Sequence, residues 1–136
     1  MKNKIGNSAA GYIPERDPNV TSALKTLLDS CAGSLAALVA TDDGFVVAEA
    51  FKREMAVKSL AAITSSLMGL AESMVKETDQ WPCRNVVIEA DNGNIVSLRV
   101  ADQRVLTAIA SKETSLGMLL SAAKACAETL NRNGAQ

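Results

Sequence analysis

The sequence predicts an α/β domain of the α+β type, in which a mainly antiparallel sheet lies between helices. Three observations predict this class. The apolar periodicities follow the order helix, two strands, helix, three strands, helix. Short polar turns separate the strands within each group, which favours antiparallel hairpins. Strands such as Ser34–Thr41 carry apolar residues on both sides, so they need cover on both faces of the sheet.

The first helix is expected over residues 18–32. Asp17 can cap its first turn, and Pro18 suits the first helical position, where the missing N–H costs nothing. Gly33 is placed to end the helix in a left-handed conformation. The apolar positions at spacings of three and four are Val20, Leu24, Leu27, Leu28 and Cys31.

Two strands and a tight turn follow this helix. Ser34–Thr41 and Phe45–Phe51 read as strands, and the Asp42-Asp43-Gly44 turn between them is a strong hairpin signal. The sequence therefore predicts a first hairpin directly after the first helix.

The middle helix, expected over residues 55–77, has an unusual surface. No charged residue occurs between Lys58 and Glu72. Its core-facing positions are expected to be Val57, Leu60, Ala61, Thr64, Leu67, Met68, Ala71, Met74 and Val75. The other side carries Ser59, Ala62, Ser66, Gly69 and Ser73, with Ile63 and Leu70 at the edge. This side is either a serine-rich exposed face or a contact with another chain, because small residues permit close approach. We favour a dimer interface, to which the next strand adds Val86 and Ile88.

The remaining elements are three strands and a last helix. The strands are expected at Val86–Ala90, Ile95–Val100 and Arg104–Ala110, and the helix over residues 115–131, capped by Thr114 or Ser115. The expected organisation is a flexible N-terminal tail over residues 1–16, one domain over 17–132 and a C-terminal tail over 133–136.

Composition excludes several classes of function. The chain has 136 residues with 14 Lys+Arg against 15 Asp+Glu, and only 3% of its residues are aromatic. Neither a basic phosphate-binding patch nor a base-stacking platform is expected, so nucleic acid is not a predicted partner. Histidine is absent, which excludes His-based catalytic triads and metal sites that contain a His ligand. The three cysteines form no C-x-x-C pair and no long apolar stretch occurs, so we expect a reduced cytoplasmic protein with no membrane association.

Motifs for independent catalysis are also missing. Neither a phosphate-binding glycine loop nor G-x-S-x-G occurs. Asp42 and Asp43 are explained by their turn, and the possible catalytic carboxylates Glu49 and Glu89 are better explained as edge or partner-facing strand residues. We therefore expect an interaction module rather than an enzyme, with no catalytic, cofactor-binding or metal-binding residue.

Two passages resemble the Roadblock family, also called the dynein light-chain Roadblock type, which includes bacterial MglB-like proteins. They are the hairpin Leu35–Ala48 and the helix opening Ser115–Leu120, and the uncharged middle helix also fits. The resemblance covers residues 17–132 and implies a five-stranded antiparallel sheet. It also implies homodimers, or heterodimers with a related Roadblock chain, in which sheets join edge to edge and middle helices pair. The implied partner is a small Ras-like GTPase, whose GTP hydrolysis some bacterial members stimulate.

Two other functions stay open at this point. One is a structural adaptor of a motor or secretion complex, and the other is a small-ligand sensor with a profilin-like or GAF-like fold. For GTPase stimulation, an arginine finger is one route, with candidates Arg53, Arg84, Arg99 and Arg104. The resemblance implies instead that the GTPase is reshaped without an inserted arginine, so no arginine is assigned a catalytic role.

Overall fold

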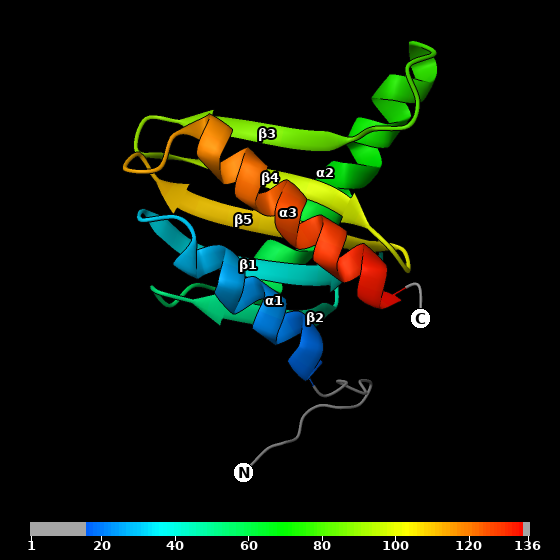
Figure 1. The fold of residues 1–136 in the computed structure, drawn as a ribbon. Coiled ribbons are helices and arrows are strands. Elements are labelled where there is room, and N and C mark those ends of the chain that lie inside the picture. The colour runs from blue at the N-terminus through cyan, green and yellow to red at the C-terminus, as the bar shows by residue number, and fades with distance from the viewer. Residues whose placement is uncertain (1–15, 135–136) are drawn as a thin grey trace.

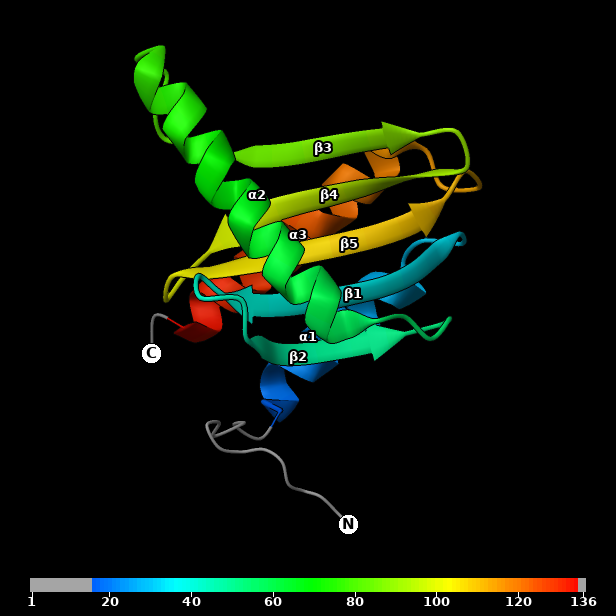
Figure 2. The ribbon, with the colours of Figure 1, turned by 180° about the vertical axis from the view of Figure 1, so that it is seen from behind.

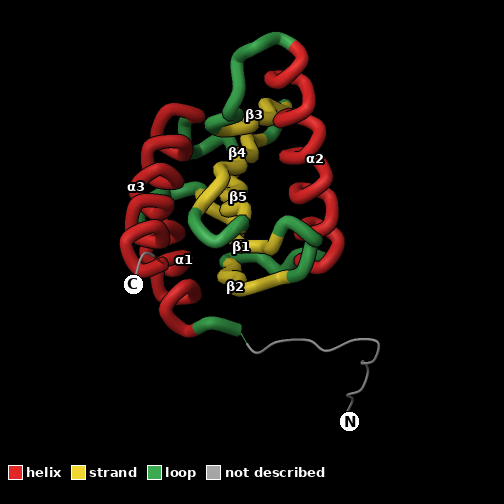
Figure 3. The backbone as a smooth tube through the Cα atoms, turned by 90° about the vertical axis from the view of Figure 1, so that its right-hand side faces the viewer, coloured by secondary structure: helices red, strands yellow, loops and turns green. Residues whose placement is uncertain are grey.

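The computed structural model describes residues 16–134 and contains the elements in the predicted order. One antiparallel five-stranded sheet has the strand order β2-β1-β5-β4-β3. Helices α1 and α3 cover one face and α2 covers the other (Figures 1, 2 and 3). The α+β class predicted from the sequence is therefore confirmed. The elements are α1 (Pro18–Asp29), β1 (Ser34–Thr41), β2 (Val46–Phe51), α2 (Val57–Glu77), β3 (Asn85–Ala90), β4 (Gly93–Val100), β5 (Arg104–Ser111) and α3 (Leu116–Gly134).

Helix α2 connects two groups of strands, β1 and β2 before it and β3, β4 and β5 after it. The group β1–β2 joins the group β3–β4–β5 through β1 and β5, with Ala37 opposite Ala108 and Leu38 opposite Thr107. Strands β2 and β3 are consequently the two edges of the sheet.

The two faces of the sheet are packed differently. The larger apolar core lies under α1 and α3 and includes Leu24, Leu106 and Leu119, all fully buried. Under α2 the apolar cluster is small; its buried members are Leu38, Ala40, Val46 and Ala61. The same face also buries hydroxyl groups, because Ser97 Oγ and Thr107 Oγ1 share a hydrogen bond of 2.9 Å. Helix α2 therefore packs against fewer buried apolar side chains than α1 and α3 do.

Helix α1 ends at Asp29, so the prediction of a helix to residue 32 is wrong. Ser30 closes the helix through its N–H, and Ser34 Oγ donates to Leu28 O at 2.6 Å as the chain turns into β1. Cys31 is buried beyond the helix end. Gly33 is not a left-handed cap. A Cβ there would clash with side chains of the β5–α3 turn, so this glycine permits close packing of two loops.

The core-facing side of α2 was predicted only in part. Ala61, Thr64, Ser65 and Met68 are buried, whereas Met74 is 71% exposed, contrary to the prediction. The last turns of α2 extend past β3, so no strand of residues 16–134 lies beneath them (Figure 2). Ser65, which the apolar pattern missed, is buried because its Oγ donates to Thr41 O at 2.8 Å.

The ends of the domain differ slightly from the predicted bounds. Ser115, rather than Thr114, caps α3, because its Oγ accepts from Met118 N at 3.1 Å. Thr114 Oγ1 instead accepts from Gly33 N. Helix α3 continues to Gly134, into the range expected as a C-terminal tail. Of the expected N-terminal tail, residues 1–15 lie outside the described residues, and Arg16 is bonded to Glu49.

Candidate interaction surface

The side of α2 that points away from the sheet is not covered by the residues that the structure describes. Ile63 and Leu70 on it are 60% and 66% exposed. All seven residues of α2 assigned to a dimer interface from the sequence are exposed: Ser59, Ala62, Ile63, Ser66, Gly69, Leu70 and Ser73. Exposed large apolar side chains that lie close together on a protein often mark an interaction site.

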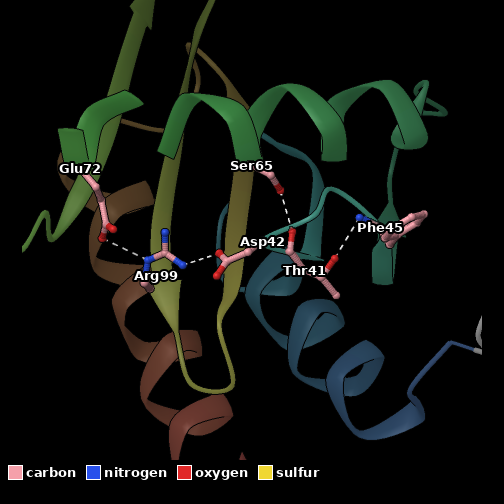
Figure 4. Close-up of polar contacts among 6 residues, drawn as sticks. All are labelled: Thr41, Asp42, Phe45, Ser65, Glu72 and Arg99. Carbon is pink, nitrogen blue, oxygen red and sulfur yellow. Dashed lines mark hydrogen bonds and ion pairs between the residues drawn. The ribbon is translucent and has the colours of Figure 1, made fainter. Parts of the chain in front are cut away.

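The two flanks of α2 have different neighbours. One flank contacts the β1–β2 turn, where Gly44 packs against Ala62 and Ser65 bonds to Thr41 (Figure 4). At about 100° per residue, Ile63 lies roughly 160° around the helix axis from Ser65. The apolar side chains therefore occupy the flank away from the turn, and this flank has no large neighbour among residues 16–134.

The other residues assigned to the interface, Val86 and Ile88, lie on the same face of the sheet as α2. Val86 is opposite Ser97 and Ile88 is opposite Ile95 in the β3–β4 pair. Side chains of alternate residues share a face, and Arg99, two residues after Ser97 on β4, bonds to α2. Val86 is half-buried and Ile88 is 39% exposed. The structure thus brings the predicted interface residues of α2 and β3 to one face of the sheet.

Arg99 connects α2 to the sheet and to the first hairpin. Its Nε donates to Glu72 Oε2 at 3.2 Å, and its Nη1 donates to Asp42 Oδ1 (Figure 4). Burial lowers the pKa of Arg99, but its bonds to Asp42 and Glu72 outweigh this effect and raise the pKa above its ordinary value. Arg99 is thus held in place, unlike the exposed Arg53 and Arg84, while Arg104 is half-buried.

The two carboxylates singled out from the sequence, Glu49 and Glu89, lie on the two edge strands of the described sheet. Glu49 is held by Arg16, and Glu89 is exposed on β3. Burial raises the pKa of Cys126 to about 11, which keeps this thiol protonated near neutral pH. Residues 16–134 contain no cluster of His, Cys, Asp or Glu suited to a metal ion. The same residues form no helix that could cross a membrane.

A shallow groove lies between α1 and α3 on the opposite face of the sheet. Its volume is about 560 Å³, and small side chains such as Ala122, Ala125 and Thr129 line it. No charged side chain lines this groove. It therefore lacks the ionic group that would orient a charged ligand.

The fold is an α+β domain in which one five-stranded antiparallel sheet has helices on both faces. The family model of the Roadblock/LC7 domain matches residues 22–110. The match covers more than half of the chain, so the chain belongs to the Roadblock/LC7 family. The resemblance stated from the sequence is thereby confirmed.

Solved structures support the same fold. The chain is similar to MglB of Myxococcus xanthus, with a TM-score of 0.79 and 18% identity over 88% of this chain and 97% of that chain. The gliding protein MglB of Thermus thermophilus gives a TM-score of 0.80 and 16% identity over 90% of this chain and 95% of that one. The structure of MglB with a tetrameric arrangement gives a TM-score of 0.80 and 17% identity over 90% of this chain and 94% of that chain.

A more distant likeness reaches outside the family. Profilin IB of Acanthamoeba castellanii has a TM-score of 0.61 at 10% identity, over 84% of this chain and 98% of that chain. This confirms the profilin-like character of the fold. Among curated proteins, none matches the chain in sequence.

Proposed function

We propose that this chain is a dimeric Roadblock regulator or scaffold that binds a small Ras-like GTPase in the cytoplasm. The observation that carries the proposal is the uncovered apolar flank of α2 on the same face as the open edge strand β3. An unpaired strand edge and an exposed apolar helix together form a surface that association would cover.

The proposed dimer is built from β3 and α2 of each copy, or of this chain and a related Roadblock chain. Pairing of the two β3 edges would continue the sheet and bring the apolar flanks of the α2 helices together. Ile63, Leu70, Val86 and Ile88 form the centre of this surface. Its margin on α2 is formed by Ser59, Ala62, Ser66, Gly69 and Ser73. Because the last turns of α2 extend past β3, Met74 would lie over the second copy.

The proposed contact with the GTPase includes Phe45. This aromatic side chain is 58% exposed in the β1–β2 turn (Figure 4). The turn packs on the flank of α2 opposite Ile63, so Phe45 would stay accessible in the dimer. Exposed aromatic side chains of this kind often contribute strongly to binding.

The proposal is tested with Ras-like GTPases encoded near this chain, each loaded with GDP or a GTP analogue. We expect a complex in one nucleotide state and a changed rate of GTP hydrolysis. Phe45→Ser should weaken the complex without changing the mass of the free protein. Lys25→Ser, at an exposed position of α1 on the other face of the sheet, is the control and should leave binding intact.

Two results would revise the proposal. Failure to bind any GTPase in either nucleotide state would contradict it. Binding with an unchanged hydrolysis rate would remove the regulatory role and favour the alternative of a structural adaptor.

A further inference from the structure

A small pocket lies at the end of the sheet where α1 begins, α3 ends and β4 turns into β5 (Figure 1). Its volume is about 270 Å³. Charged side chains of both signs line it, unlike the groove between α1 and α3. Its apolar wall is formed by buried members of the larger core, which are Val20, Val39, Val100 and Leu130.

Arg104 supplies the positive charge of this pocket. It is the first residue of β5 and lies opposite Val100 on β4, so the two side chains share one face of the sheet. Because Val100 belongs to the core under α1 and α3, the side chain of Arg104 leaves the sheet on that face, where it is half-buried. Arg104 forms no ion pair with a carboxylate of residues 16–134. Its guanidinium therefore faces the pocket without an anionic partner from the described chain.

Two carboxylates, of Asp17 and Asp102, line the same space. Asp17 precedes α1, and its Oδ1 accepts from Asn19 N at 3.0 Å, a bond that uses one of its two carboxylate oxygens. Asp102 is exposed in the β4–β5 turn. Ala101 N–H donates to Asn131 Oδ1 of α3 at 2.7 Å, which fixes this turn to the helix. The pocket thus presents two negative charges and one positive charge on a framework held by α1, α3 and the turn.

The charges limit what this pocket can hold. A simple anion would be attracted by Arg104 but repelled by Asp17 and Asp102, and a simple cation would be repelled by Arg104. A molecule that carries both charges satisfies both kinds of group. The volume lies below the range of about 300–1,000 Å³ typical of pockets for drug-sized ligands, so the molecule must be small. The apolar wall favours an aliphatic side chain.

We infer that this pocket binds a small aliphatic α-amino acid in its zwitterionic form. The guanidinium of Arg104 pairs with the ligand carboxylate, a geometry that allows two parallel hydrogen bonds. Asp17 and Asp102 balance the ammonium group, and the side chain contacts Val20 and Leu130. The pocket lies on the face of α1 and α3, whereas the proposed dimer uses α2 and β3. The inference therefore does not depend on the proposed function, and failure to bind a GTPase would leave it standing.

Titration of the ¹⁵N-labelled full-length chain with L-valine tests the inference. We expect saturable amide shifts centred on residues 101–104 and on the first turn of α1. N-acetyl-L-valine lacks the ammonium charge and L-valinamide lacks the carboxylate. Each should bind at least about tenfold more weakly than L-valine, because each leaves a charged group of the pocket unpaired.

Two variants assign the charges to their partners. Arg104→Gln should weaken L-valine binding at least about tenfold but change L-valinamide binding little, because the amide has no carboxylate to lose. Asp102→Asn, in an exposed turn, should weaken L-valine while changing N-acetyl-L-valine little. Arg132→Gln is the matched control, since Arg132 lies in the last turn of α3 but does not line the pocket. It should bind L-valine like the unmodified chain.

Any of three results would overturn the inference. The first is the absence of shifts with L-valine up to its solubility limit. The second is equal binding of L-valine and its two derivatives, because the contact would then be apolar and unspecific. The third is unchanged L-valine affinity in both Arg104→Gln and Asp102→Asn.

Discussion

Arg99 on β4 donates to Glu72 on α2 at 3.2 Å, and this ion pair links the helix to the face of the sheet that it covers. The same guanidinium bonds to Asp42 in the β1–β2 turn. Since the apolar cluster under α2 is small, the ion pairs of Arg99 contribute to the position of this helix and of the surface it carries.

Replacing Arg99 with Met should therefore loosen α2. We expect the free energy of unfolding to fall by about 1 kcal/mol, because the ion pairs are partly exposed and their strength is screened. Urea denaturation measures the change. Arg84→Met is the control, since Arg84 is exposed and has no ion pair within residues 16–134. Equal losses in the two variants would show that Arg99 does not fasten the helix.

Leu70→Asp should abolish the proposed dimer while the single chain stays folded. Leu70 is 66% exposed in one copy, so a charge there costs little until a second chain covers it. Gly69→Glu at the margin should also weaken the dimer, and the single chain should stay folded because a side chain at Gly69 meets nothing within 4 Å there. Sedimentation velocity measures both. Thr26→Asp on α1 introduces the same charge on the other face and should leave the dimer intact.

Gly93→Ala should destabilise the fold by about 1–3 kcal/mol, because the added methyl group would collide with the Ala110 carbonyl of β5. Gly117→Ala is the matched substitution. A Cβ at Gly117 meets no neighbour, and alanine there should stabilise α3 by up to about 1 kcal/mol. Thermal unfolding measures both shifts, and a stable Gly93→Ala variant would contradict the close approach of β4 to β5.

The free energy of unfolding at alkaline pH should depend on the buried thiol of Cys126. Its pKa is raised from 9.0 to about 11 in the folded chain, so the unfolded thiol loses its proton first. Stability should fall as pH rises from about 9 to about 11, by at most about 1.4 kcal/mol per pH unit. Cys126→Ala should lack this contribution while retaining that of the other titrating groups. Parallel curves for the two proteins would contradict the assignment.

Local patterns of the sequence predicted the order of elements and most of their bounds. The Asp-Gly turn at residues 42–44 and the two-residue turn at 91–92 separate strands by short-range chemistry, which a sequence displays directly. The end of α1 was missed because hydrogen bonds from Ser30 and Ser34 close it, although the apolar spacing continues to Cys31.

Long-range features could not be predicted in the same way. Helical periodicity assigned Met74 to the core, but it contains no information on where the sheet beneath the helix ends. Arg99 was only one of several candidate arginines, because its partners Asp42 and Glu72 are distant in sequence. The sequence placed the small residues of α2 beside Ile63 and Leu70, but it contains no information on which side of the helix the β1–β2 turn occupies.

Molar mass in solution, determined by light scattering, tests the central claim most directly. The chain has a mass of 14.2 kDa. We predict twice this value for the unmodified protein and the single-chain value for Leu70→Asp. A single-chain mass for the unmodified protein across its accessible concentrations would contradict the account, because the flank of α2 would then face water.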